Sequence, residues 1–172
     1  IQLIRHSVAL LHWDQETGMP KKAIGERSEQ LGLLEGMAHE MLAADEMGEL
    51  LAVAGFPSET PIASGLESPG RSEAESLDRA FLRALRREYE RATKIPKRII
   101  TELASEVSTA QSVWVDARNR DDFSSFAPHL EKILSLNIEK AQSLGYAVRP
   151  YDGLIDEYEP WMTVDAVDRV FA

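Results

Sequence analysis

Apolar residues recur every three or four positions along most of this chain, the spacing that places side chains on one face of an α-helix. Ile1, Ile4, Val8 and Leu11 begin the pattern. It predicts helices over residues 1–13, 21–44, 46–54, 72–94, 97–120 and 129–144, and a last one that begins at Thr163. No pair of segments alternates as paired β-strands do. The sequence therefore predicts an all-α fold of about six or seven helices, some of them long and antiparallel.

Proline and glycine mark the expected breaks between these helices. Pro96 suits the first position of a helix, where its missing N–H costs nothing, so we expect a hinge at Ile95-Pro96. Pro128 is expected to begin the helix over residues 129–144, and Gly145 to end it. Residues 55–70 contain three prolines, three glycines and three serines, and are therefore expected to form a loop.

Composition limits the class of protein. The chain has 172 residues, 44% of them apolar, which suits one globular domain or a large piece of a longer protein. Its net charge of −10 repels phosphate backbones, so nucleic acid is not an expected partner. No apolar run approaches the roughly 20 residues that span a bilayer, and no secretion signal is visible, so no membrane association is expected. The absence of cysteine excludes disulfides and thiolate sites, and we expect a cytoplasmic protein.

Two groups of conspicuous side chains are interpreted as structural. The first is a series of basic residues with glutamates between them, which is interpreted as a solvated helix face. They are Arg83, Arg86, Arg87, Arg91, Lys94, Lys97 and Arg98. The tryptophans Trp13, Trp114 and Trp161 are interpreted as anchors of the hydrophobic core rather than as platforms for a ligand.

A zinc site of the HExxH type would place two histidines one helical turn apart, with a glutamate beside the metal. His39-Glu40 begins such a motif, but Ala43 stands where the second histidine belongs. No two of the four histidines in the chain have the required spacing. We therefore expect no intact metal site within this chain.

The stretch LLHWDQETGMP, residues 10–20, concentrates polar side chains between an apolar run and a proline. His12, Asp14 and Glu16 would share a face on a strand, but this segment leaves a helix, so they need not converge. The favoured interpretation is a corner between two helices, in which Asp14 or Thr17 caps the helix end. The individual roles of His12, Asp14 and Glu16 stay open.

Acidic residues are densest near the end of the chain. Asp152 and Asp156 lie four positions apart, so one of them could act as a general acid with a raised pKa. A weaker alternative makes Asp152, Asp156 and Glu159 a site for a hard cation. The favoured interpretation is that Asp152 caps a short helix and the other carboxylates are solvated. No serine-nucleophile motif and no glycine-rich phosphate loop is present.

A series of short motifs extends, in order, over nearly the whole chain. They are WDQETGMP at 13–20, RxxQL at 27–31, AHE at 38–40, IP at 95–96, AQ at 110–111 with Trp114, Ala117 and Arg118, DF at 122–123, FAPHL at 126–130 with Lys132, and YDxLxDxYEP at 151–160. In this order they resemble the N-terminal region of the carboxypeptidase Taq family, the M32 metallocarboxypeptidases. Two positions depart from the family pattern. Gly18 replaces a larger residue, and Trp161 replaces a glycine, which we expect to reshape the turn before Met162-Thr163.

The resemblance implies a much longer, mostly helical, cleft-shaped enzyme that is cytoplasmic and often homodimeric. Such enzymes remove C-terminal residues from peptides with broad specificity. The resemblance also implies a divalent metal, usually zinc, held by HExxH and a downstream glutamate that lie beyond the region matched here. Because no catalytic motif of the family has a matching position in this chain, the resemblance assigns it no catalytic, cofactor-binding or metal-ligating residue.

We therefore expect residues 1–172 to form the N-terminal helical wall or lid of a carboxypeptidase Taq-like enzyme, inactive as an isolated segment. The last helix shows no C-terminal stop signal before Ala172, which favours a fragment of a longer protein. The alternative is a stand-alone helical interaction module without catalysis. An HExxH motif farther along the coding sequence would favour the enzyme, and a stop codon after Ala172 would favour the module.

Overall fold

The computed structural model describes residues 1–55, 77–146 and 148–172, and every regular element in these ranges is helical. The elements are α1 (Gln2–Thr17), the short 3-10 helix η1 (Lys21–Ala23), α2 (Ile24–Ala43), α3 (Asp45–Val53), α4 (Leu77–Lys94), α5 (Lys97–Asn119), α6 (Phe123–Leu144), α7 (Pro150–Tyr158) and α8 (Val164–Phe171). The prediction of an all-α fold is confirmed. The loop expected at 55–70 lies outside the described residues, Gly55 excepted. So does the expected start of the fourth helix at residue 72.

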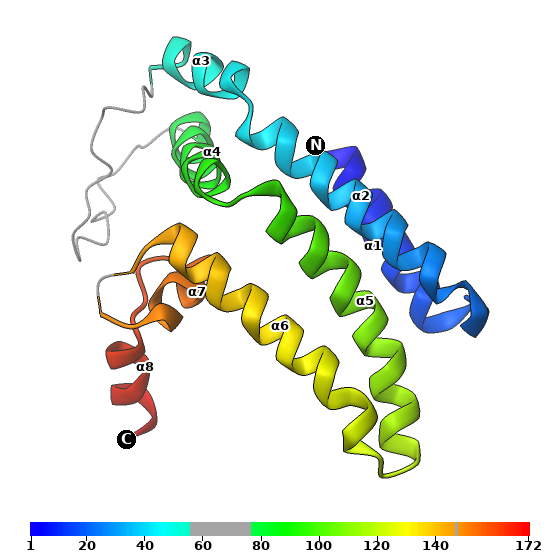
Figure 1. The fold of residues 1–172 in the computed structure, drawn as a ribbon. Helices are drawn as coiled ribbons and strands as arrows, with labels where there is room; N and C mark the ends of the chain where they lie inside the picture. The colour runs from blue at the N-terminus through cyan, green and yellow to red at the C-terminus, as the bar shows by residue number, and fades with distance from the viewer. Residues whose placement is uncertain (56–76, 147) are drawn as a thin grey trace.

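The long helices pack side by side in antiparallel pairs (Figure 1). α1 and α2 form one hairpin, α5 and α6 form another, and α2 lies along α5. α4 contacts α2, α3 and α6 at one end of the long helices, while α7 and α8 follow the end of α6. The core runs between the hairpins, where Leu31 of α2, Ile99 of α5 and Leu136 of α6 are buried. None of the helices in these ranges combines the length and the apolar character needed to cross a bilayer.

Two glycines let α2 approach α5 closely. A Cβ atom on Gly36 would lie 2.7 Å from the hydroxyl oxygen of Thr101, and one on Gly32 would lie 3.0 Å from the Thr101 carbonyl oxygen. Both distances are shorter than ordinary van der Waals contact. Any larger residue at these positions would therefore push the two helices apart.

The break predicted at Ile95-Pro96 separates α4 from α5. Pro96 is the residue that precedes the first turn of α5 rather than its first helical residue. α2 holds this joint from the side, because Nε2 of His39 donates a hydrogen bond to the carbonyl oxygen of Ile95 at 2.8 Å. Glu40 adds an ion pair to Lys97 at 2.7 Å. His39-Glu40, the first half of a zinc motif in the sequence, thus ties two helices together.

The predicted start of the helix over residues 129–144 is wrong. α6 begins at Phe123, and Asp122 caps it by accepting a hydrogen bond from the main-chain N–H of Ser125 at 3.3 Å. Pro128 lies inside this helix. Because its ring nitrogen carries no hydrogen, only the bond to the Ser124 carbonyl is lost, and the helix continues. The first helix also runs farther than predicted, to Thr17.

The tryptophans are not core anchors, contrary to the prediction. Trp13 is 67% exposed, Trp114 42% and Trp161 50%. Two of them lie under guanidinium groups: Arg118 is 5.2 Å from the ring centre of Trp114, and Arg87 is 5.8 Å from that of Trp161. Small side chains such as Ala110 and Ala117 fill the interior of the α5 face instead.

Candidate functional site

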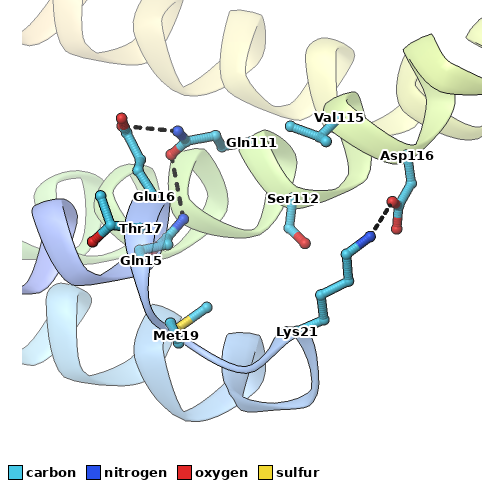
Figure 2. Close-up of a pocket in the computed structure, with 9 residues that line it drawn as sticks. All are labelled: Gln15, Glu16, Thr17, Met19, Lys21, Gln111, Ser112, Val115 and Asp116. Carbon is cyan, nitrogen blue, oxygen red and sulfur yellow. Dashed lines mark hydrogen bonds and ion pairs between the residues drawn. The ribbon is translucent and has the colours of Figure 1, made fainter.

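The corner after α1 borders a pocket of about 420 Å³. The last turn of α1 and the connection to η1 form one side of it, and α5 from Gln111 to Asp116 forms the other (Figure 2). Glu16 and Lys21 bring charges to the pocket, while Met19 supplies apolar surface. This combination of a concave surface and a few oriented polar groups is typical of a binding site.

A chain of hydrogen bonds orients the polar side chains on the α1 side. The buried hydroxyl of Ser108 donates to Oε1 of Gln15 at 2.7 Å, and Nε2 of Gln15 donates to the Ser108 carbonyl at 3.1 Å. The same Nε2 donates to Oε1 of Gln111 at 3.3 Å. Nε2 of Gln111 then donates to Oε1 of Glu16 at 2.9 Å. The Glu16 carboxylate is therefore held at the pocket by a relay that begins at a buried group.

An ion pair forms the opposite end of the pocket. Nζ of Lys21 lies 2.8 Å from Oδ1 of Asp116. The hydrogen bond and the charge of Lys21 hold the pKa of the Asp116 carboxyl below its usual value. Lys21 is largely exposed and Asp116 is half exposed, so the pair can open when another charged group arrives.

The structure does not bring His12, Asp14 and Glu16 together. Oδ2 of Asp14 pairs with Nη2 of Arg27 at 2.5 Å, and the largely buried Arg27 also donates to the Leu11 carbonyl. Glu16 points instead to Gln111. The Asp14–Arg27 pair fastens α1 to α2 just before the corner. No local pattern marks Gln15, Ser108 or Gln111 as parts of this arrangement, since their partners lie more than ninety residues away along the chain. Nor does one mark Arg27, whose partner Asp14 lies on the preceding helix.

Two of the four histidines, His39 and His129, take structural roles. Besides His39 at the α4–α5 joint, Nδ1 of His129 lies 2.5 Å from Oε1 of Glu106, and Lys132 contacts the other oxygen of Glu106 at 2.5 Å. Burial alone would raise the pKa of Glu106. Hydrogen bonds and charges from Lys132 and His129 outweigh that effect, so the pKa lies below its usual value.

The described part of the chain does not fit the metal that the family resemblance implies. Within it, no three His, Asp or Glu side chains gather in a group that could hold a metal ion. Nε2 of His39 and Nδ1 of His129 are already engaged by a carbonyl and a carboxylate. No step through a metal can therefore be assigned to the described residues.

The acidic segment near the C-terminal end is a structural junction, and the favoured interpretation of Asp152 as a cap of a short helix is confirmed by its capping box at the start of α7. Asp152 accepts hydrogen bonds from the main-chain N–H groups of Val164 at 2.8 Å and Arg149 at 3.0 Å, which lower its pKa. Asp156 pairs with Arg87 at 2.6 Å and with Arg91 at 2.5 Å. Asp156 is therefore not a solvated carboxylate, contrary to the favoured interpretation. The general-acid and cation-site alternatives gain no support, because both aspartates already have partners.

The basic face of α4 is only partly solvated, which corrects its interpretation from the sequence. Arg86 is buried and pairs with Glu90 at 2.7 Å. Arg87 and Arg91 cross to Asp156 and fasten α4 to α7. Their partner lies more than sixty residues away along the chain, so no local pattern marks the pairing.

Comparison with known proteins places this arrangement in a family. Residues 1–172 match the sequence model of the carboxypeptidase Taq (M32) metallopeptidases. Thermostable carboxypeptidase 1 of Pyrococcus furiosus is 36% identical over 171 residues, 99% of this chain and 32% of that protein. Carboxypeptidase 1 of Bacillus subtilis is 32% identical over 166 residues, 96% of this chain and 30% of that protein.

Solved structures agree with the sequence comparisons. The BsuCP crystal structure superposes with a TM-score of 0.82 at 31% identity, over 98% of this chain and 31% of that one. The apo-Mg structure of Pyrococcus furiosus carboxypeptidase gives a TM-score of 0.69 at 36% identity, with the same coverage. The chain spans about a third of the length of these relatives. It belongs to the carboxypeptidase Taq (M32) family of metallopeptidases.

Proposed function

We propose that this chain forms a helical wall of the peptide-binding groove in a longer M32 metallocarboxypeptidase, an enzyme that releases C-terminal residues from peptides. One observation carries the proposal. The chain matches the family from residue 1 to residue 172, yet covers only about a third of the curated relatives described above, both of which are named carboxypeptidases.

In this proposal the chain contributes no catalytic group. The divalent metal that the family implies, zinc in our proposal, would be held by residues on another part of the enzyme, where it would supply Lewis-acid chemistry to the peptide carbonyl. The described residues support this division, because His39, His129 and most of the buried charges are committed to contacts between helices. The role left to them is to shape the groove and to position the peptide.

Side-chain contacts that fix the helices relative to one another support the proposed role as a wall of the groove. Asp14–Arg27 joins α1 to α2, the Gln15–Ser108 bonds join α1 to α5, and Arg91–Asp156 joins α4 to α7. The joint at Ile95-Pro96 is the one place where we propose movement. Hydrogen exchange on the full-length protein, with and without a peptide analogue, tests this. Unchanged protection across residues 90–97 would count against a hinge.

Activity measurements test the proposal directly. The full-length protein, supplied with zinc, should release C-terminal residues one at a time from a blocked peptide, as followed by mass spectrometry. Residues 1–172 alone, under the same conditions, should release none above a metal-free blank. Release by the isolated segment would overturn the non-catalytic role. Absence of release by the full-length protein would favour a helical interaction module instead.

The remaining properties are proposed from the family resemblance and the charge. We propose a cytoplasmic enzyme that forms a homodimer and does not bind nucleic acid or membranes; the net charge of −10 supports the last two points. Sedimentation of the full-length protein tests the dimer, and co-sedimentation with anionic vesicles tests membrane binding.

A further inference from the structure

We propose that the pocket between α1 and α5 receives a lysine or arginine side chain of the peptide substrate, with the Glu16 carboxylate as its counter-charge. The inference rests on the proposed function, because it names a preference of the groove to which this wall would belong. It concerns binding only, and it gives Glu16 no part in bond cleavage.

The charge balance of the pocket favours a cation. Asp116 is matched by Lys21 at 2.8 Å, so these two charges offset each other. Glu16 contacts the uncharged amide of Gln111 at 2.9 Å, and no cation in the described ranges forms an ion pair with it. Among the described charged side chains that line the pocket, Glu16 is therefore the one without a cationic partner. A cationic side chain would supply its partner, and an acidic one would be repelled.

The carboxylate is held in place before any ligand arrives. Gln111, its hydrogen-bond donor, is bound by Gln15 at 3.3 Å, and Gln15 is bound by the fully buried Ser108. A preoriented acceptor loses less conformational freedom on binding than a free surface glutamate does. Selectivity for charge is thus more marked here than at an isolated surface carboxylate.

The shape of the pocket suits a long amphipathic side chain. At about 420 Å³ it lies near the lower end of the range for ligand pockets, so it fits a side chain rather than an extended peptide. Figure 2 shows Glu16 at one end, the Lys21–Asp116 pair at the other, and Ser112 between them. Met19 and Val115 line the same space. The methylene stem of lysine or arginine can pack on these apolar atoms while its charged head reaches a carboxylate.

The experiment uses the full-length protein and paired blocked peptides that carry either lysine or the uncharged norleucine, moved one position at a time upstream of the C-terminal residue. kcat/KM is measured for wild type, Glu16→Gln and Glu29→Gln. Glu16→Gln keeps an oxygen that can accept from Gln111. Glu29→Gln removes the same charge from an exposed site on α2 outside the pocket.

At one or more positions wild type should prefer lysine over norleucine by about two- to fivefold, the range of an exposed ion pair. The ratio of kcat/KM for the lysine peptide to that for the norleucine peptide should fall towards one in Glu16→Gln and persist in Glu29→Gln. In wild type it should decrease with added salt. Equal values at every position, or a preference that survives Glu16→Gln, would overturn the inference while leaving the proposed function intact.

If the full-length protein releases no residue from any peptide, the proposed function fails, and calorimetry on the same peptides decides the inference separately. Tighter binding of a lysine peptide to wild type, lost in Glu16→Gln, would support the pocket. Equal affinity for the lysine and norleucine peptides would reject it.

Discussion

Oδ1 of Asp156 accepts a hydrogen bond from the main-chain N–H of Trp161 at 2.8 Å, in a turn where Trp161 has a φ of 67°. This left-handed conformation suits glycine, the residue that the family pattern has at this position. The tryptophan therefore occupies a glycine-type turn. Asp156 and the guanidinium of Arg87 above the indole ring hold it there.

Replacing Trp161 should reveal the backbone strain. Trp161→Ala and Trp161→Gly both remove the ring contact with Arg87, but only glycine relaxes at positive φ. We expect the Trp161→Gly variant to be more stable than the Trp161→Ala variant by up to about 1 kcal/mol in free energy of unfolding. This value already allows for the greater flexibility of glycine in the unfolded chain, which works against the glycine variant. Urea denaturation measures the difference, and the reverse order would show that the turn is not strained.

Asp156 should be important for stability, because it is the common partner of two guanidinium groups that are mostly buried. Asp156→Asn leaves Arg87 and Arg91 without their counter-charge and should lower the free energy of unfolding by about 2 to 3 kcal/mol. Asp165→Asn is the control, because the Asp165–Arg149 pair is largely exposed and should be worth less than about 1 kcal/mol. Equal effects in urea denaturation would contradict the assignment of Asp156 as the main link between α4 and α7.

Gly36 and Gly25 lie on the same helix but should respond in opposite ways to alanine. Alanine is the better helix former, so Gly25→Ala, which meets no atom within 4 Å, should stabilise the protein by about 0.5 to 1 kcal/mol. Gly36→Ala should destabilise it by about 1 to 3 kcal/mol, because the new methyl group collides with Thr101 and Lys97.

The hydroxyl of Thr101 offers a second test of the Gly36 contact, since it is buried and has no hydrogen-bond partner among the described residues. Adding Thr101→Ala to Gly36→Ala should recover part of the loss. Both comparisons use thermal or urea denaturation, and a stabilised Gly36→Ala variant would mean that α2 and α5 are not in close contact.

Helix positions could be predicted well because periodicity depends on residues three or four apart, although the buried faces of α2 and α5 also contain polar residues such as Arg27 and Ser108. The start of α6 could not, because Pro128 resembles a helix start in the sequence, whereas the helix begins five residues earlier behind Asp122, which accepts from Ser125. The predicted burial of Trp114 in the core is also wrong. Its position on the stripe indicates a helix face, but the inner part of that face is filled by the small Ala110 and Ala117.

The candidate site shows where local patterns stop being informative. The stretch WDQETGMP marks the corner, but the partner of Gln15 is Ser108, and the partner of Lys21 is Asp116. These pairings depend on how α1 packs on α5, more than ninety residues away along the chain. Hydrophobic spacing carries no information about such distant polar contacts.

Glu106 should make the folded state sensitive to acid. Because its folded-state pKa lies below the usual value of 4.5, its contribution to stability is present above that pH and is lost as the pH falls through the folded-state pKa. We expect Glu106→Gln to be less stable than wild type by about 2 kcal/mol at pH 7. The difference should shrink at pH 3, as measured by urea denaturation. A difference that does not change with pH would show that the ionised form makes no special contribution.

His39 should control the opening of the α4–α5 joint. Its Nε2 donates to the Ile95 carbonyl at 2.8 Å, next to a proline that cannot donate a hydrogen bond of its own. His39→Phe preserves a ring of similar size but removes this donor, so local opening should become easier by about 1 kcal/mol. Amide exchange across residues 90–97 should then be roughly fivefold faster, while exchange in the middle of α6 should stay unchanged. His6→Phe is the matched control, because His6 is exposed on α1 and contacts only Gln2 among the described side chains. Equal acceleration in both variants would mean that general loosening of the protein, and not the loss of one bond at the joint, is responsible.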